Sequence, residues 1–142
     1  MQVQEALKGL PSADMFVLEM QAPRSPTLGF LGISIELRIL EAFVHALART
    51  TLSTPVQSVD ARMVAHYFGI RAKNRQAKKK AAVELVTQLF SNVEHQTPMG
   101  NRIQIPDDLK AYFLKEKKKD DLSDCLLQAI AVFEWGQLAL DL

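Results

Sequence analysis

The sequence predicts a helix-rich α/β fold. Two short apolar runs, at 14–20 and 56–59, have the composition of β-strands, and a long amphipathic segment separates them along the chain. Strands that alternate with helices favour a parallel sheet, because two parallel strands need a crossover connection of about a dozen residues or more. Two strands make only a small sheet, so helices should form most of the structure.

Residues 1–60 supply both predicted strands. The run at 14–20 is bounded by turn-forming residues, which is typical of a buried strand, and the shorter run alternates in the way of a half-buried one. The helix between them has an apolar face that includes Leu37, Leu40 and Val44. The elements predicted here, in order, are a short helix at 1–10, a strand at 14–20, a loop at 22–27, a helix from about 31 to 49 and a strand at 56–59.

Residues 61–142 are predicted to be mostly helical. Asp60 and Asn74 are typical helix N-caps, and Gly69 is a typical residue at which a helix ends. Pro106 suits the start of a helix, because its missing N–H group has no partner there anyway. The elements predicted here are helices at 61–68, 76–90, 106–114 and about 120–140, with a loop at 97–101.

The composition is that of a globular protein, and 142 residues suffice for a single domain with its own core. Cys125 is the only cysteine, which excludes an internal disulfide and suits a reducing compartment. The three histidines show no metal-ligand spacing with each other or with this cysteine. No apolar run is long enough to span a bilayer, and the first five residues do not read as a targeting signal.

Charge is segregated along the chain, although the formal net charge is only +1. Residues 1–60 hold four basic and six acidic residues, whereas residues 61–119 hold thirteen basic and five acidic residues. Residues 120–142 hold five acidic residues and none that is basic. A basic middle followed by an acidic helix suits a phosphate backbone that is bound beside a carboxylate cluster.

Three aspartates begin the last predicted helix. Asp121 and Asp124 are three residues apart and share one helix face, where two carboxylates could hold a divalent cation. Acidic side chains at a helix N-terminus are also stabilised by the helix dipole, so together with Asp120 they suit a purely structural role as well. Glu19, at the end of the first strand, has two interpretations too: it faces the acidic pair as a ligand, or it is solvated beyond the strand.

A run of cations lies on the helix at 76–90 and just before it. It is either a solvated helix face or a surface that contacts phosphates, and the density of cations favours phosphate contact with a strong salt dependence. The lysines at 115–119 either extend this surface or offset the repulsion among the aspartates. The candidate phosphate contacts are Arg71, Lys73, Arg75, Lys78, Lys79, Lys80, Lys117 and Lys118.

The last helix also carries a core face and an apolar end. Leu127, Ile130 and Glu134 recur at helical spacing and predict a buried face. The closing stretch, which includes Phe133 and Trp135, is too apolar for a free tail and suggests contact with a second subunit.

Several of these motifs together resemble a known family. They are Phe16-Val17-Leu18-Glu19, Glu41-Ala42-Phe43 in the long helix, the lysine-rich helix and the closing Lys118-Lys119-Asp120-Asp121-Leu122-Ser123-Asp124. This set is similar to the RuvC-like branch of the RNase H-like nucleases, which includes the mitochondrial and poxviral Holliday junction resolvases. The chain also resembles the mitochondrial transcription elongation factors, in which a resolvase-derived domain is catalytically silent.

The resemblance implies a site and a fold. In the resolvases four carboxylates bind divalent metal ions, and Glu19, Asp121 and Asp124 match three of them. Lys79 or Lys80 matches a lysine that contacts phosphate. The aspartate of the first resolvase strand has no counterpart, so the resemblance implies a partial RNase H-like fold that lacks its first strands and is truncated at its N-terminus.

Three functional hypotheses remain from the sequence. In the first, a silent domain acts as a mitochondrial transcription elongation factor that contacts mitochondrial RNA polymerase and DNA or RNA, forms a homodimer and needs no cofactor. In the second, the chain is a Mg²⁺-dependent Holliday junction resolvase that uses the three retained carboxylates. In the third, the chain is a truncated or alternatively spliced product without activity of its own. The resemblance implies a mitochondrial location for the first two.

Overall fold

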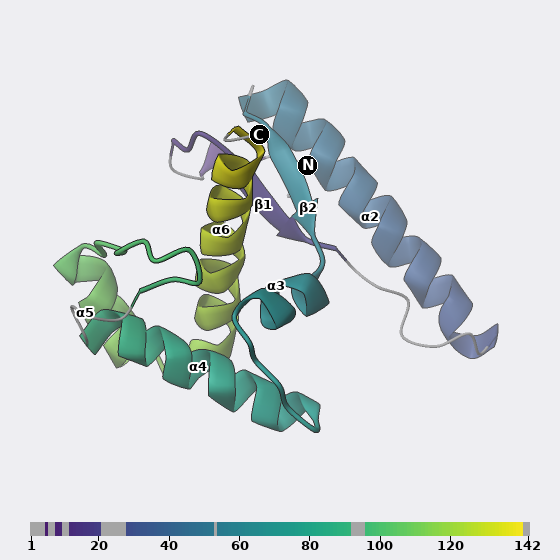
Figure 1. The fold of residues 1–142 in the computed structure, drawn as a ribbon. Helices are drawn as coiled ribbons and strands as arrows, with labels where there is room; N and C mark the ends of the chain where they lie inside the picture. The colour runs from purple at the N-terminus through teal and green to yellow at the C-terminus, as the bar shows by residue number, and fades with distance from the viewer. Residues whose placement is uncertain are drawn as a thin grey trace. The chain divides into compact units, whose positions relative to one another are not determined.

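The computed structural model describes residues 5, 8–9, 12–20, 28–52, 54–91 and 96–140, and Figure 1 shows its elements. The contacts divide the chain into two compact units, Met1–Asp60 (unit 1) and Ala61–Leu142 (unit 2), and each is described by itself. The single domain expected from the sequence stays a prediction. The predicted helix at 1–10 lies mostly, and the predicted loop at 22–27 wholly, outside the described residues.

Unit 1 is a small parallel α/β unit made of β1 (Phe16–Glu19), α2 (Leu28–Leu52) and β2 (Val56–Val59). The two strands pair in parallel, with Phe16 opposite Val56 and Glu19 opposite Val59. The predicted parallel arrangement is confirmed, and α2 is the crossover that it requires. The helix extends a few residues beyond each predicted end; at the C-terminal end the chain meets no proline before Pro55.

The contact between α2 and β2 is partly polar. Ser58 donates a hydrogen bond of 2.6 Å to Glu41 Oε1, and its Oγ lies 2.8 Å from His45 Nε2. Ala48 and Val59 are buried close to this group, whereas Leu37 and Leu40 of the predicted apolar face are exposed. Among the described side chains of α2, which begin at Ile35, the buried ones therefore lie toward the C-terminal end of the helix.

Unit 2 is built around one long helix. Its elements are α3 (Ala61–Tyr67), α4 (Arg75–Ser91), α5 (Asp107–Lys115) and α6 (Lys119–Leu140). Both α3 and α4 pack against α6 (Figure 1), and Val86, Leu127 and Ala131 are among its most buried side chains. The rings of Phe90 and Phe113 meet edge to face at 4.8 Å and join α4 to α5.

Local signals place the helix ends of unit 2 where the sequence predicts them. Gly69 has a φ of 66°, and Ile70 N–H donates to Ala65 C=O at 2.8 Å, so the chain leaves α3 through a left-handed residue. Asn74 Oδ1 accepts the N–H of Ala77 at 2.8 Å, which is the hydrogen bond of a helix N-cap. These short-range contacts fix how the basic residues at the start of α4 are presented.

Candidate nucleic-acid interface

The acidic start of α6 is the centre of the candidate site. Asp120 and Asp121 lie in the first turn of the helix, and Asp124 lies one turn further on. The helix dipole stabilises carboxylates at this end. Ser123 is fully buried, and its hydroxyl donates to Lys119 C=O at 2.8 Å, which anchors the turn on its inner side.

Lysines are paired with the first two carboxylates. Lys79 of α4 donates a short hydrogen bond to Asp120, and Lys118 Nζ lies 2.5 Å from Asp121 Oδ2. The hydrogen bond from Lys79 lowers the pKa of Asp120 below its ordinary value. Asp121 in turn raises the pKa of Lys118. The acidic turn therefore carries its own counter-charges, and one of them comes from a helix about forty residues earlier in the chain.

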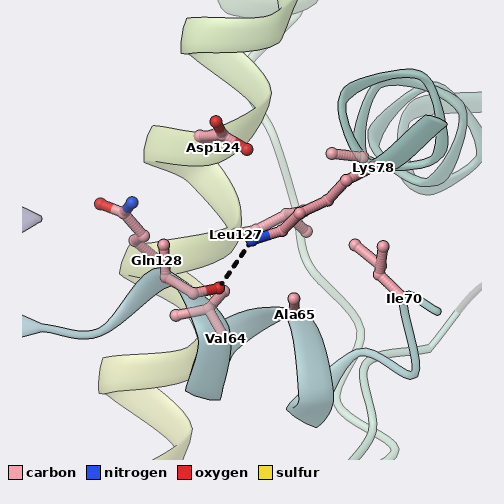
Figure 2. Close-up of a pocket in the computed structure, with 9 residues that line it drawn as sticks. Val64, Ala65, Ile70, Lys78, Asp124, Leu127 and Gln128 are labelled. Atoms are coloured by element: carbon pink, nitrogen blue, oxygen red, sulfur yellow. Dashed lines mark hydrogen bonds between the residues drawn. The ribbon is translucent and has the colours of Figure 1, made fainter. Parts of the chain in front are cut away.

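Asp124 lies beside a third lysine. Both Asp124 and Lys78 line a small pocket of about 20 Å³ between α3, α4 and α6 (Figure 2), which is room for about one water molecule. The ammonium group of Lys78 donates to Ala61 C=O at 3.2 Å, at the start of α3. Gln128 and Leu127 of α6 complete this side of the pocket. Lys78 thus lies between Asp124 on α6 and the N-terminal end of α3.

A broad groove of about 1050 Å³ opens next to the acidic turn, between the first half of α4 and the segment before α6. Among the residues that the structure describes, Glu84 and Asp120 are the only carboxylates that line it, and no aromatic side chain does. Because base stacking needs aromatic faces, the groove is suited to phosphates rather than to unstacked bases. The cations that line it are Arg75, Lys79, Lys80, Lys117 and Lys119.

The structure separates the predicted cations into two groups. Lys78, Lys79 and Lys118 make the contacts described above with the acidic turn or with α3. The other predicted residues are exposed, and Lys80 makes only a long pair of 3.8 Å with the exposed Glu84. The exposed predicted cations are Arg71, Lys73, Arg75, Lys80 and Lys117.

Among the described residues, no three His, Cys, Asp or Glu side chains are grouped so that they could hold a metal ion. Glu19 is exposed at the end of β1 in unit 1, whereas Asp121 and Asp124 belong to unit 2, so the grouping of these three stays a prediction. Since Asp120 and Asp121 already hold ammonium groups, the donors of this turn fit Mg²⁺ poorly as they stand.

Sequence reasoning missed a second polar cluster, around Glu134 in the later half of α6. Glu134 is 1% exposed and accepts hydrogen bonds from Thr97, from Asn101 Nδ2 at 2.8 Å and from the Tyr67 hydroxyl at 2.7 Å. Burial, reinforced by the hydrogen bond to Glu134, raises the pKa of Tyr67 to about 12. The only sequence signal for this cluster was that Glu134 recurs at the same helical spacing as the apolar residues on the buried face of α6.

The fold is that of a helix-rich α/β protein with a small two-stranded parallel sheet and a charged start to its last helix. The sequence pattern of the family described as "Mitochondrial resolvase Ydc2 / RNA splicing MRS1" matches residues 3–142, so the chain belongs to this family. The resemblance predicted from the sequence is thereby confirmed. No solved structure matches the chain.

A curated mouse protein is also similar to this chain. It is the mitochondrial transcription elongation factor of Mus musculus, which is 26% identical over 143 residues. The match takes in 94% of this chain but only 38% of the mouse protein. Both the family and this relative are mitochondrial, in agreement with the predicted mitochondrial localisation. No helix among the described residues is long and apolar enough to cross a membrane.

Proposed function

We propose that this chain is a catalytically silent, resolvase-derived domain that binds nucleic acid and supports transcription elongation in mitochondria. Membership of the resolvase family supports the origin of the domain, and similarity to the mouse elongation factor supports the process. Mitochondrial RNA polymerase is the proposed protein partner. We further propose that the chain is a single RNase H-like domain that lacks the first strands of that fold and forms a homodimer.

One observation carries the silent interpretation. The carboxylates that would bind metal in a resolvase lie beside lysines, with Lys118 on Asp121 and Lys79 on the adjacent Asp120. Two-metal cleavage of a phosphodiester needs several carboxylates that hold two ions about 3.5–4 Å apart. Ammonium groups on these carboxylates compete with the ions, so we propose that the chain requires no metal cofactor.

The same pairing supports a binding role. With the acidic turn neutralised, the net field beside it is positive and comes from exposed cations in the groove, such as Arg75, Lys80 and Lys117. A nucleic acid that lies in the groove would exchange condensed counterions for these side chains, which makes binding salt-dependent and largely independent of sequence.

Binding can be tested with a labelled DNA duplex at several salt concentrations. Each cation that contacts a phosphate adds about 0.9 to the slope of log affinity against log salt, so Lys80→Gln and Lys117→Gln should each reduce the slope by about that amount. Arg49→Gln, an exposed change in unit 1, is the matched control and should leave the slope unchanged. Equal slopes for all four proteins would contradict the groove as the binding site.

Function can be tested by transcription in vitro with mitochondrial RNA polymerase. Adding the chain should increase the fraction of long transcripts, and the double variant Lys80→Gln/Lys117→Gln should lose this effect. Transcript lengths that do not respond to the wild-type chain would contradict a role in elongation for this domain by itself.

The alternative function is a Mg²⁺-dependent Holliday junction resolvase. It is favoured by the retention of Glu19, Asp121 and Asp124, which a domain that has long been silent has no need to keep. Incubation of a four-way DNA junction with Mg²⁺ or Mn²⁺ separates the two functions. Cleavage by the wild type that disappears in Asp124→Asn would sink the silent interpretation, whereas binding without cleavage would sink the resolvase.

A further inference from the structure

An apolar pocket lies on the later half of α6, apart from the basic groove. The loop at 97–103 and the face of α6 at 129–134 enclose about 290 Å³. The start of α6, which borders the groove, lies about ten residues earlier, or ~15 Å along the helix axis at 1.5 Å per residue. The pocket is thus a second surface of unit 2, and the contacts proposed for nucleic acid do not use it.

The accessible lining of this pocket is almost wholly apolar. Ile130 forms part of its buried wall with an exposure of 8%, while the Phe133 side chain at its edge is 64% exposed. Ala129 is exposed on the same side, one helical turn before Phe133. A large aromatic side chain next to an apolar hollow is a typical feature of a protein contact.

The wall of the pocket is held rigidly by the polar cluster behind it. Glu134 ties the loop to α6 through Thr97 and Asn101, and to α3 through Tyr67. The loop is closed on itself by a hydrogen bond of 3.0 Å between Thr97 N–H and Asn101 C=O. Because the walls of the pocket are already fixed, less conformational entropy is lost when a ligand binds.

The positive charge of Arg102 at the rim of the pocket favours a ligand with a negative charge. Arg102 is exposed and lines the pocket, and its guanidinium forms no ion pair with a described residue. A carboxylate next to the entering group could pair with this exposed guanidinium in a bidentate geometry.

The size and chemistry of the pocket indicate what kind of partner enters. It lies at the lower end of the range for small-molecule sites, about 300–1,000 Å³, and apart from Arg102 at its rim its lining has few of the accessible polar groups that orient such ligands. A stable dimer of two copies would need about 1,200 Å² of buried surface, which is far more than this pocket alone can supply.

We propose that this pocket docks one large apolar side chain of a protein partner, within a short acidic segment whose carboxylate pairs with Arg102. The apolar side chain fills the space beside Ile130 and Phe133, and the acidic neighbour sets the orientation of the segment. Association through a single anchor is weak by itself and suits a contact that forms and breaks during a cycle.

The probes for a test are short fluorescent peptides with a central Leu, Ile or Phe between aspartates, added to the full chain. At least one should bind and shift the NMR amide signals of Ile103, Ala129 and Phe133. Replacing its central residue by Ala should weaken binding by about tenfold or more, as expected for a buried apolar side chain. Ala129→Trp, which fills the pocket, should abolish binding, and the exposed Ala111→Trp on α5 should not.

Charge reversal tests the role of Arg102. Arg102→Glu should weaken binding of the acidic peptide and favour a peptide whose aspartates are replaced by lysines. No shift of the pocket signals with any peptide at ~1 mM, a concentration that detects even weak binding, would overturn the proposal. Shifts of the same signals that grow with protein concentration in the absence of peptide would also overturn it, since a second copy would then be the occupant.

Discussion

The two halves of α6 carry their carboxylates in opposite ways. At its start, the part-buried Asp120 and the exposed Asp121 are matched with the ammonium groups of lysines. In its later half, Glu134 is fully buried and receives hydrogen bonds only from neutral groups among the described residues. Carboxylates therefore contribute to the surface charge at the start of α6 and to the packed structure in its later half.

The difference follows from access to water. An exposed ion pair exchanges one well-solvated arrangement for another, so its net contribution to stability is about 0–1 kcal/mol and falls with salt. A buried carboxylate has lost its water completely and must be satisfied by the protein. We expect changes at Glu134 to alter stability and changes at the acidic turn to alter binding.

The largest expected effect is that of Glu134→Ala. The change leaves the hydroxyls of Tyr67 and Thr97 and the amide of Asn101 without their acceptor in a buried place, and it also creates a cavity. We expect the free energy of unfolding to fall by about 2–4 kcal/mol, measured by urea denaturation.

Glu84→Ala on α4 is the matched control for that change. Glu84 is an exposed helical glutamate whose pair with Lys80 spans 3.8 Å, so its replacement should alter stability by less than about 0.5 kcal/mol. If both variants lost the same stability, the structural role assigned to Glu134 would be wrong.

A smaller effect is expected for Tyr67→Phe, and it should depend on pH. The hydroxyl of Tyr67 has its pKa raised from 10.0 to about 12 in the folded protein. A group whose folded pKa is raised stabilises the fold fully below its unfolded pKa and loses that stabilisation as pH rises through the folded pKa. The wild type should thus lose stability between pH 10 and pH 12.

The comparison of wild type with Tyr67→Phe isolates this effect. The variant keeps the ring that meets Trp135 edge to face at 5.5 Å, and loses only the hydrogen bond to Glu134, at a cost of about 1–2 kcal/mol near neutral pH. The stability difference between the two proteins should shrink as pH rises from 10 to 12. A constant difference over that range would show that the raised pKa is not linked to folding.

The parts of this structure that rest on short-range signals could be predicted from the sequence. Asn74 caps α4, Gly69 ends α3, and Pro106 precedes α5, as their local chemistry requires. The parallel pairing of β1 with β2 was predictable too, because a helix of crossover length lies between them.

The pairing of Lys79 with Asp120 could not be predicted. The sequence places thirteen basic residues between positions 61 and 119 and gives no rule for which of them reaches the acidic turn. Lys79 and Asp120 meet only because α4 packs on α6, a contact that buried apolar residues such as Val86 and Leu127 determine. The partners of Glu134 come from α3 and from the loop at 97–101, so their convergence is likewise a result of tertiary packing.

The smallest expected effect on stability is at the acidic turn itself. In a double-mutant cycle of Lys79→Ala and Asp120→Asn, the coupling energy should be small and should fall further in high salt, since the pair is partly solvated. The lowered pKa of Asp120 predicts that this contribution is lost as pH falls below the ordinary carboxyl range. Asp120→Asn should meanwhile tighten the binding of duplex DNA, because it removes a negative charge from the groove and releases Lys79 to a phosphate. A coupling energy as large as the effect of Glu134→Ala would mean that the acidic turn, too, is primarily structural.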